Sequence, residues 1–380
     1  MATYQQYEKK NGAKAWLFQG YIGTDEVTGK KKFTTRRGFR TKRDAQLAYD
    51  KLRLDKKENG FHNTNITTFQ QLYDLWIVDY KQTVKPSTYA ITLTVFDLYI
   101  LPHFKKLKLN KITVSYCQTV LNEWYQEYSA YASIKTKLNL VLNYGVSIEA
   151  MESNPMAKTQ MPRRKEKDKK INFYTKEQLL AFLDGYKTLN DPMKYTYFHL
   201  LAYTGMRKSE ALALQWSDIN FLKNEIKIGK TIAKDETGKF ILQLPKTEKS
   251  YRTISIDPTT MNLLKEWQAM QRTYLLKLGY NSNNPNQLLF SSRKNGFIRS
   301  TDIGKWLEPM HSKYPTMPKI TPHGFRHTHC SLLFEAGVSM KEVQERLGHK
   351  DIATTMNIYA HVTPEKIKDT ASKFAQFMAL

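Results

Sequence analysis

A charged stretch near the middle of the sequence divides the chain into parts that cannot share one hydrophobic core. Residues 161–170 read Met-Pro-Arg-Arg-Lys-Glu-Lys-Asp-Lys-Lys and have no apolar periodicity, which is typical of a linker. A length of 380 residues also favours more than one core. We therefore predict a multi-domain chain, with domains over residues 1–62, 63–160 and 173–380 and a basic linker over residues 161–172.

The first part of the chain has the pattern of a small sheet followed by one helix. Aromatic and β-branched residues fill positions 16–22 and 30–37, with turn-forming residues between them, which predicts strands. Thr41 and Asp44 form a variant of the capping box and predict a helix that runs towards Gly60. We expect a three-stranded sheet with this helix on one face. The other face is expected to carry Lys31, Thr34, Arg36 and similar residues.

Residues 63–160 have apolar side chains at helical spacing throughout. One helix begins near Phe69, a second opens at Pro86, and two more fit residues 113–128 and 131–151. The aromatic residues that recur along these helices are expected to form a core. This part is therefore predicted to be an all-α bundle.

The part after the linker mixes helices with short strands. Thr175 and Gln178 form a capping box at one helix start, and Asp257 followed by Pro258 starts a long helix. Three strands are expected between them, near residues 225–228, 240–244 and 251–256. This pattern predicts an α+β domain, within a chain that is mainly α with small β-sheets.

A large excess of positive charge indicates a polyanionic partner. The 59 Lys and Arg residues outnumber the 35 Asp and Glu residues, for a net charge of +24, and nucleic acid is the usual counterpart of such an excess. No apolar run is long enough for a membrane span, and no apolar leader opens the sequence. Cys117 and Cys330 follow no pairing pattern. We expect a cytoplasmic protein that works on nucleic acid, away from membranes.

The stretch from Thr321 to His327 is the most specific motif in the sequence. We predict a helix start here, with Thr321 as the N-cap and Pro322 at the first helical position. His323 and Arg326 then lie one turn apart on the same face. His323 also lies at the positive end of the helix dipole, which favours its neutral, proton-accepting form.

Three further residues are expected at or near helix ends, and the first of them lies at an N-terminus, where a phosphate binds readily. Gly205 breaks one helix, so that Arg207 lies at the start of the next, among free backbone N–H groups. Gly348 suits the left-handed position after a helix, which places His349 just past that end. A following helix then presents Tyr359.

These residues belong to four boxes that resemble those of the tyrosine recombinase (phage integrase) family in order and spacing. The boxes are Thr204-Gly205-Met206-Arg207-Lys208-Ser209-Glu210, His323-Gly324-Phe325-Arg326-His327, Leu347-Gly348-His349 and Tyr359. The resemblance covers the whole chain and implies an arm-type DNA-binding domain, a SAM-like core-binding bundle and a catalytic domain. It implies a site-specific integrase, similar to those of temperate phages and conjugative transposons of Gram-positive bacteria, that integrates and excises a mobile element.

The resemblance also implies how the matched residues cut and rejoin DNA. Tyr359 is the nucleophile that forms a 3′-phosphotyrosyl intermediate, and His323 is the base that accepts its proton. Arg207, Arg326 and His349 hold the non-bridging oxygens of the phosphate, where charge develops.

Two assignments around this set stay open. The family takes the proton for the leaving 5′-oxygen from a lysine in a β-turn; Lys246 is the candidate, and Lys249 in the same turn is its competitor. Glu210 either orients Arg207 or faces solvent.

The implied chemistry needs no metal, nucleotide or other cofactor, because exchanging a phosphodiester for a phosphotyrosine nearly conserves bond energy. His323 and His327 have the spacing of a zinc-binding helix, and His329 and Cys330 lie nearby. However, the glutamate of that motif is missing and Arg326 would place a positive charge beside the ion. We therefore predict no metal site.

The expected partner is double-stranded DNA carrying attachment sites, bound by a homo-tetramer, with an excisionase and a host DNA-bending protein as accessory partners. The candidate DNA-binding residues outside the catalytic set are Lys31, Arg36, Arg37, Arg163 and Arg164. A type IB topoisomerase, a chromosome-dimer resolvase and a non-catalytic DNA-binding regulator are the alternative functions. An apolar stripe after Tyr359 is expected to pack either in cis or on a neighbouring protomer; it consists of Ile367, Ala371, Phe374, Phe377 and Met378.

Overall fold

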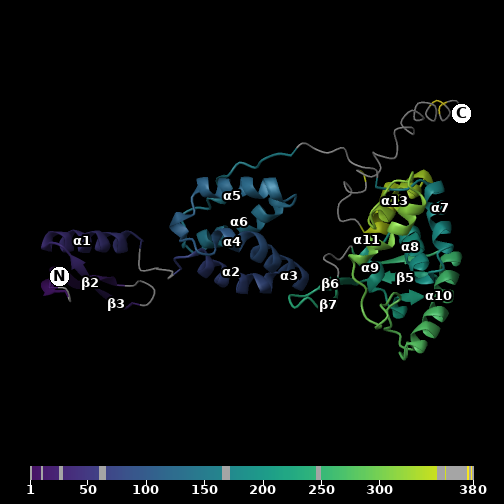
Figure 1. The fold of residues 1–380 in the computed structure, drawn as a ribbon, viewed down its shortest axis with the longest axis horizontal. Coiled ribbons are helices and arrows are strands. Elements are labelled where there is room, and N and C mark those ends of the chain that lie inside the picture. The colour runs from purple at the N-terminus through teal and green to yellow at the C-terminus, as the bar shows by residue number, and fades with distance from the viewer. Residues whose placement is uncertain are drawn as a thin grey trace. The chain divides into compact units, whose positions relative to one another are not determined.

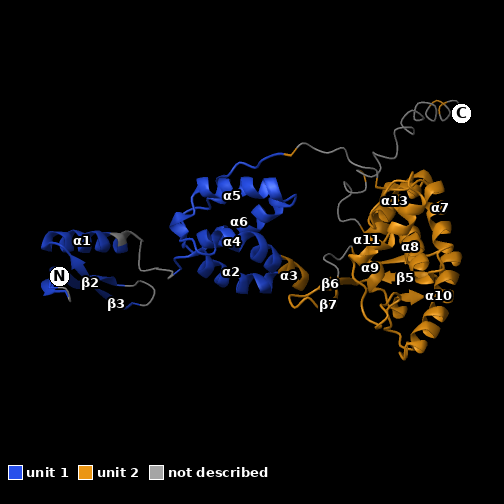
Figure 2. Ribbon diagram, viewed as in Figure 1, with its two compact units in different colours: residues 1–84, 92–163 blue, residues 85–91, 164–380 orange. Residues whose placement is uncertain are grey.

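The computed structural model of the chain has two compact units, which are described separately below (Figure 2). The first comprises residues 1–84 and 92–163, and the second residues 85–91 and 164–380. The residues that the structure describes are 2–9, 12–24, 29–59, 66–164, 172–244 and 250–348, with Met356, Ala375 and Met378.

The first unit begins with an antiparallel sheet and one helix, as predicted (Figure 1). Its elements are β1 (Thr3–Glu8), β2 (Lys14–Thr24), β3 (Lys31–Phe39) and α1 (Lys42–Asn59), and β2 is the middle strand. The predicted capping box is present, since Thr41 and Asp44 exchange backbone-to-side-chain hydrogen bonds of 3.1 Å. Phe18, Ala45 and Tyr49 form the core between the sheet and α1.

The prediction for the open face of this sheet was wrong for Arg36 and Thr34. Arg36 is paired with Phe18, and Thr34 with the buried Gly20. Residues directly opposite each other on neighbouring strands point to the same side, so both lie on the α1 side. The regular part of β3 alternates, which leaves Lys31 and Arg37 on the open face, with Phe33 at 66% exposure.

The rest of the first unit is the predicted helical bundle. Its elements are α2 (Phe69–Thr83), the end of α3 (Pro86–Val95), a π-helical turn (Phe96–Ile100), α4 (Leu101–Phe104), a 3₁₀ turn (Leu109–Lys111), α5 (Val114–Glu127), α6 (Tyr131–Ser147) and a second 3₁₀ turn (Met156–Lys158). Residues 86–91 of α3 belong to the second unit. The aromatic residues do form its core, among them Phe69, Trp76, Phe96 and Trp124. The helix predicted over 131–151 ends earlier, at Ser147, because Glu149 takes a left-handed backbone with φ of 59°.

The second unit is the predicted α+β domain. Its helices are α7 (Lys176–Lys187), α8 (Pro192–Thr204), α9 (Lys208–Ala213), α10 (Pro258–Lys277), α11 (Asp302–Trp306), α12 (Glu308–Lys313), α13 (Gly324–Glu335) and α14 (Met340–Leu347), with a 3₁₀ turn over Trp216–Asp218. Its strands are β4 (Ile219–Asn220), β5 (Glu225–Ile228), β6 (Thr231–Lys234), β7 (Phe240–Gln243) and β8 (Arg252–Ser255). The strands β4 and β6 were not predicted.

The strands of the second unit form two small sheets, β4-β5-β8 and β6-β7. The predicted second and third strands, β7 and β8, therefore belong to different sheets. The capping box of Thr175 and Gln178 and the N-cap Asp257 are present as predicted. The helix α8 is buried along most of its length and contacts α7, α10 and α13 (Figure 1). Its C-terminal end is therefore held on several sides, and the candidate site begins there.

In the parts of the chain that the structure describes, no helix combines the length and the apolar character that crossing a membrane requires.

Candidate active site

Gly205 ends α8 and determines the position of Arg207, two residues later. Its backbone is left-handed, with φ of 62°, and a Cβ atom there would lie 2.5 Å from Leu347 and 2.6 Å from His329. A glycine is required for both reasons. The turn that it makes brings Arg207 to the N-cap of α9, as the sequence predicted.

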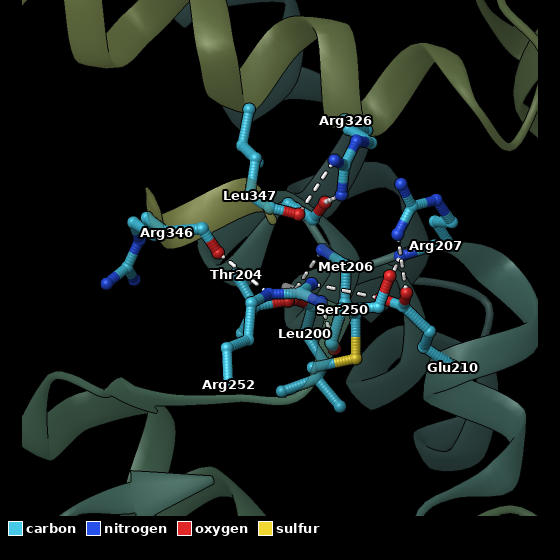
Figure 3. Close-up of polar contacts among 11 residues, drawn as sticks. Leu200, Thr204, Met206, Arg207, Glu210, Ser250, Arg252, Arg326, Arg346 and Leu347 are labelled. Atoms are coloured by element: carbon cyan, nitrogen blue, oxygen red, sulfur yellow. Dashed lines mark hydrogen bonds and ion pairs between the residues drawn. The ribbon is translucent and has the colours of Figure 1, made fainter. Parts of the chain in front are cut away.

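Glu210 holds Arg207 in place by accepting two hydrogen bonds from it across the first turn of α9 (Figure 3). The backbone N–H of Arg207 donates to Glu210 Oε2 at 3.0 Å, and its Nη1 donates to Oε1 at 2.7 Å. The Glu210 side chain is 6% exposed, whereas that of Arg207 is 40% exposed. Glu210 therefore does not face solvent, and of its two predicted roles the structure is consistent with orienting Arg207.

Arg326 is buried at 1% exposure and joins the ends of two helices. Its Nη1 donates to the carbonyl of Gly205 at 3.0 Å, and its Nη2 donates to the carbonyl of Leu347 at 2.7 Å (Figure 3). These carbonyls lie at the C-terminal ends of α8 and α14, where the helix leaves them without partners.

The predicted start of the helix that carries Arg326 was wrong. The N-cap of α13 is His323, not Thr321. The N–H and the hydroxyl of Thr321 both donate to Asn172 Oδ1, at 2.8 and 3.2 Å. Asn172 lies 149 residues before Thr321 in the sequence. Because the Thr321 hydroxyl binds Asn172, it does not cap the helix as the local sequence pattern predicts.

His323 lies at the N-cap of α13 and is neutral at pH 7, as predicted. Desolvation lowers its pKa to about 4, and the nearby His327 and several positive charges add to the shift. Among those charges are Arg326 and Arg207. His323 thus shares one electrostatic environment with both arginines, and its neutral ring is able to accept a proton.

Two further arginines belong to this cluster and were not predicted. Arg252, the first residue of β8, donates from Nη2 to Glu210 Oε2 at 2.9 Å and from Nε to the carbonyl of Arg346 at 2.8 Å. Arg346 donates from Nη2 to the carbonyl of Tyr203 at 3.2 Å and from Nε to His329 Nε2 at 3.1 Å. Positive charge alone does not distinguish them from the other basic residues, so the sequence carried no local signal.

His329 and Cys330, which were weighed as metal ligands, are occupied by the protein. The Nδ1 of His329 lies 2.8 Å from the carbonyl of Ala202, and its Nε2 accepts from Arg346. Burial raises the pKa of the Cys330 thiol to about 12. Across the described residues, no group of three His, Cys, Asp or Glu side chains is arranged to hold a metal ion.

Part of the predicted set falls on segments that the structure does not describe. Lys246, Lys249, His349 and Tyr359 lie outside the described residues. Arg163 and Arg164 are exposed.

The cluster has more positive than negative charge. Arg207, Arg252 and Arg326 surround one carboxylate, that of Glu210. Burial lowers the pKa of Arg326, and the charges of Arg207 and Arg252 lower it further. An anion at this place would relieve that repulsion and accept charge-assisted hydrogen bonds. The geometry therefore suits a phosphate group.

The chain matches known families over three stretches. Residues 172–366 match the phage integrase family, residues 68–125 match the N-terminal SAM-like domain of phage integrases, and residues 4–55 match an arm DNA-binding domain. The chain belongs to the phage integrase family. It is a tyrosine recombinase of the conjugative-transposon or prophage type, an enzyme that transfers DNA strands, as the sequence motifs predicted.

Two relatives agree with this assignment over most of the chain, and a third over about half of it. The ICEBs1 integrase of Bacillus subtilis is 28% identical, over 93% of this chain and 94% of its own length. The integrase of Staphylococcus phage L54a is 30% identical, over 82% of this chain and 93% of its own length. The Tn916 transposase of Enterococcus faecalis is 29% identical, over 49% of this chain and 46% of its own length.

Solved structures share the fold. The Tn1549 transposon integrase in complex with a circular intermediate DNA has a TM-score of 0.64 and 20% identity, covering 81% of this chain and 99% of that one. A lambda integrase dimer bound to a core site has a TM-score of 0.55 and 17% identity, covering 93% of each chain. The predicted fold class is thereby confirmed.

Proposed function

We propose that this chain cuts DNA at two attachment sites and rejoins the strands in exchanged order, with Tyr359 as the nucleophile. The product is an integrated mobile element or prophage, and the reverse reaction excises it. Tyr359 is assigned from the sequence boxes, and the names of the relatives support an integrating role.

The observation that carries the proposal is the convergence of Arg207, Arg326 and a neutral His323 at the C-terminal end of α8. Arg326 binds the carbonyl of Gly205, two residues before Arg207. The charges of both arginines act on His323. Two guanidinium groups stabilise the non-bridging oxygens as charge develops on them, and the neutral imidazole accepts the phenol proton.

The remaining steps are assigned to residues outside the described part of the chain. A phenol has a pKa near ~10 in water, so Tyr359 needs both a base and neighbouring cations to attack phosphorus. His349 donates a hydrogen bond to the phosphate. Lys246 donates the proton to the departing 5′-oxygen, with Lys249 as its competitor.

The proposed assembly is four protomers on two DNA partners. Lambda integrase has been solved as a dimer bound to a core site and as a tetramer bound to a Holliday junction. For this chain we propose the same order of assembly, with residues 1–62 on accessory arm sites. An excisionase and a host DNA-bending protein would set the direction, and the reaction takes place on DNA in the bacterial cytoplasm.

A suicide substrate tests the proposed chemistry. It is a core site with a nick beside the cleavage position, so that the cut end diffuses away and the covalent complex accumulates. The full-length protein should form an adduct that survives denaturing electrophoresis, and Tyr359→Phe should abolish it while still binding the DNA. Tyr274→Phe, at an exposed position on α10, is the matched control and should form the adduct normally. An undiminished adduct with Tyr359→Phe would overturn the assignment.

A further inference from the structure

Glu210 is buried between two arginines that come from different elements. Arg207 reaches it from the N-cap of α9, and Arg252 reaches it from the first residue of β8. Figure 3 shows the carboxylate between the two guanidinium groups. The two arginines differ in their surroundings: the Arg252 side chain is 6% exposed and that of Arg207 is 40% exposed.

The buried arginine is the stronger partner of the carboxylate. Burial would raise the pKa of Glu210, but the pKa is lowered overall. The charge and hydrogen bond of Arg252 are the largest causes of that lowering, ahead of those of Arg207. Because screening by water is weak at a buried pair, Glu210 and Arg252 largely neutralise each other.

This neutralisation has a consequence for Arg207. A carboxylate paired with Arg207 alone would cancel its charge, and the phosphate would gain little from the contact. With Arg252 present, the three side chains carry a net charge of one positive unit, and it resides on the exposed partner. Glu210 is then able to orient Arg207 without cancelling its charge.

We propose that Arg252 is a positioning residue for strand transfer, which neutralises Glu210 so that the charge of Arg207 stays available to the scissile phosphate. The proposal rests on the assignment of Arg207 to that phosphate, made above.

Arg252 also holds the elements around Arg207 together. Its Nε donates to the carbonyl of Arg346, and Arg326 donates to the next carbonyl, that of Leu347. The last turn of α14 is therefore bound by guanidinium groups from β8 and α13. A lysine would keep the charge of Arg252, but its single ammonium group cannot reproduce a fork that points at two separate acceptors.

The test compares four variants of the full-length protein: Arg252→Met, Arg252→Lys, Glu210→Gln and the double variant Arg252→Met with Glu210→Gln. First-strand cleavage of the suicide substrate is measured in single turnover, together with affinity for the core site. Arg252→Met should slow cleavage about tenfold to hundredfold and change affinity less than about twofold, because many other phosphate contacts supply the affinity. Arg252→Lys should fall between Arg252→Met and the unmodified protein.

The double variant distinguishes a charge effect from a loss of folding. A neutral amide does not cancel the charge of Arg207, so adding Glu210→Gln should restore part of the cleavage rate that Arg252→Met removes. Arg272→Met removes an exposed arginine from α10 and should cleave at the normal rate. If the double variant cleaves more slowly than Arg252→Met, the proposal is overturned, because the effects of the two substitutions on the cleavage rate are then merely additive.

A substrate with a neutral methylphosphonate at the scissile position gives a second readout. It lacks one charged oxygen, so Arg252→Met should slow its cleavage less than it slows that of the phosphodiester. Equal losses on both substrates would contradict the proposed role. Failure of the underlying function would look different, since the unmodified protein would then form no Tyr359-dependent adduct at all.

Discussion

Arg326 and Leu347 are joined by a 2.7 Å hydrogen bond from a buried guanidinium nitrogen to a carbonyl at the end of α14. The other terminal nitrogen of the same side chain binds the carbonyl of Gly205. A residue proposed to hold the scissile phosphate is thus also a structural link between two helix ends, and its removal should affect both folding and catalysis.

Arg326→Met should therefore lower the free energy of unfolding of the catalytic domain by about 2 kcal/mol. The change leaves two carbonyls without a hydrogen-bond donor, which destabilises the fold, but it also removes a buried charge, which offsets part of that loss. Urea unfolding measures this change. Arg272→Met on α10 should stay within about 0.5 kcal/mol of the unmodified protein. If both variants unfold alike, Arg326 does not link the helices.

Gly205→Ala should be much more costly than an alanine at a comparable glycine. The left-handed backbone costs about 1–2 kcal/mol, and overlap with Leu347 and His329 adds about 1–3 kcal/mol. Gly238 is the control, since its φ is 79° and nothing lies within 4 Å of a Cβ there; Gly238→Ala should show the backbone cost alone. Equal unfolding free energies for the two variants would contradict the packing described around Gly205.

The rate of strand cleavage should stay constant with falling pH to about pH 5 and then decrease as the pH approaches 4. A base must be neutral to accept a proton, and the pKa of His323 is lowered to about 4, so its neutral form persists well below the ordinary value for histidine. Single-turnover cleavage between pH 4 and 8 tests this, with the folded fraction followed by circular dichroism. A decrease in cleavage rate centred near pH 6.5 would mean either that His323 is not the base or that its pKa is not lowered.

Removing residues 1–62 should weaken the salt dependence of binding to DNA that includes arm sites. Residues 1–60 contain 15 Lys and Arg against 7 Asp and Glu, and each lost phosphate contact lowers the log–log salt slope by roughly 0.9. Cleavage of a core site should persist. Arg37→Gln, on the open face, should lower the slope more than Arg36→Gln, on the α1 side. An unchanged slope after the deletion would argue for a merely solvated surface.

Local signals in the sequence were sufficient for most helix starts. The capping boxes at Thr41 and Thr175 and the proline at Pro86 act within one turn, so short stretches determine them. The prediction of Thr321 as an N-cap was wrong because its hydroxyl binds Asn172, far away in sequence. Arg36 was placed on the wrong face because only the partner strand, through Phe18, shows which side of the sheet is covered.

The candidate site divides in the same way. Arg207 and Glu210 lie in one turn, and their i, i+3 spacing alone brings the two side chains together. Arg252 and Arg346 became part of the site only through contacts across 42 and 94 residues of sequence. Such contacts depend on how the elements pack, and no local pattern encodes them.

The central claim is that Tyr359 attacks the phosphorus of the scissile phosphodiester. Mass spectrometry of the adduct formed on a suicide substrate, after digestion with trypsin and a nuclease, tests it most directly. The account predicts a single modified peptide with the nucleotide on Tyr359, linked through the 3′-phosphate. A nucleotide on another residue, or a linkage through the 5′-phosphate, would contradict the account.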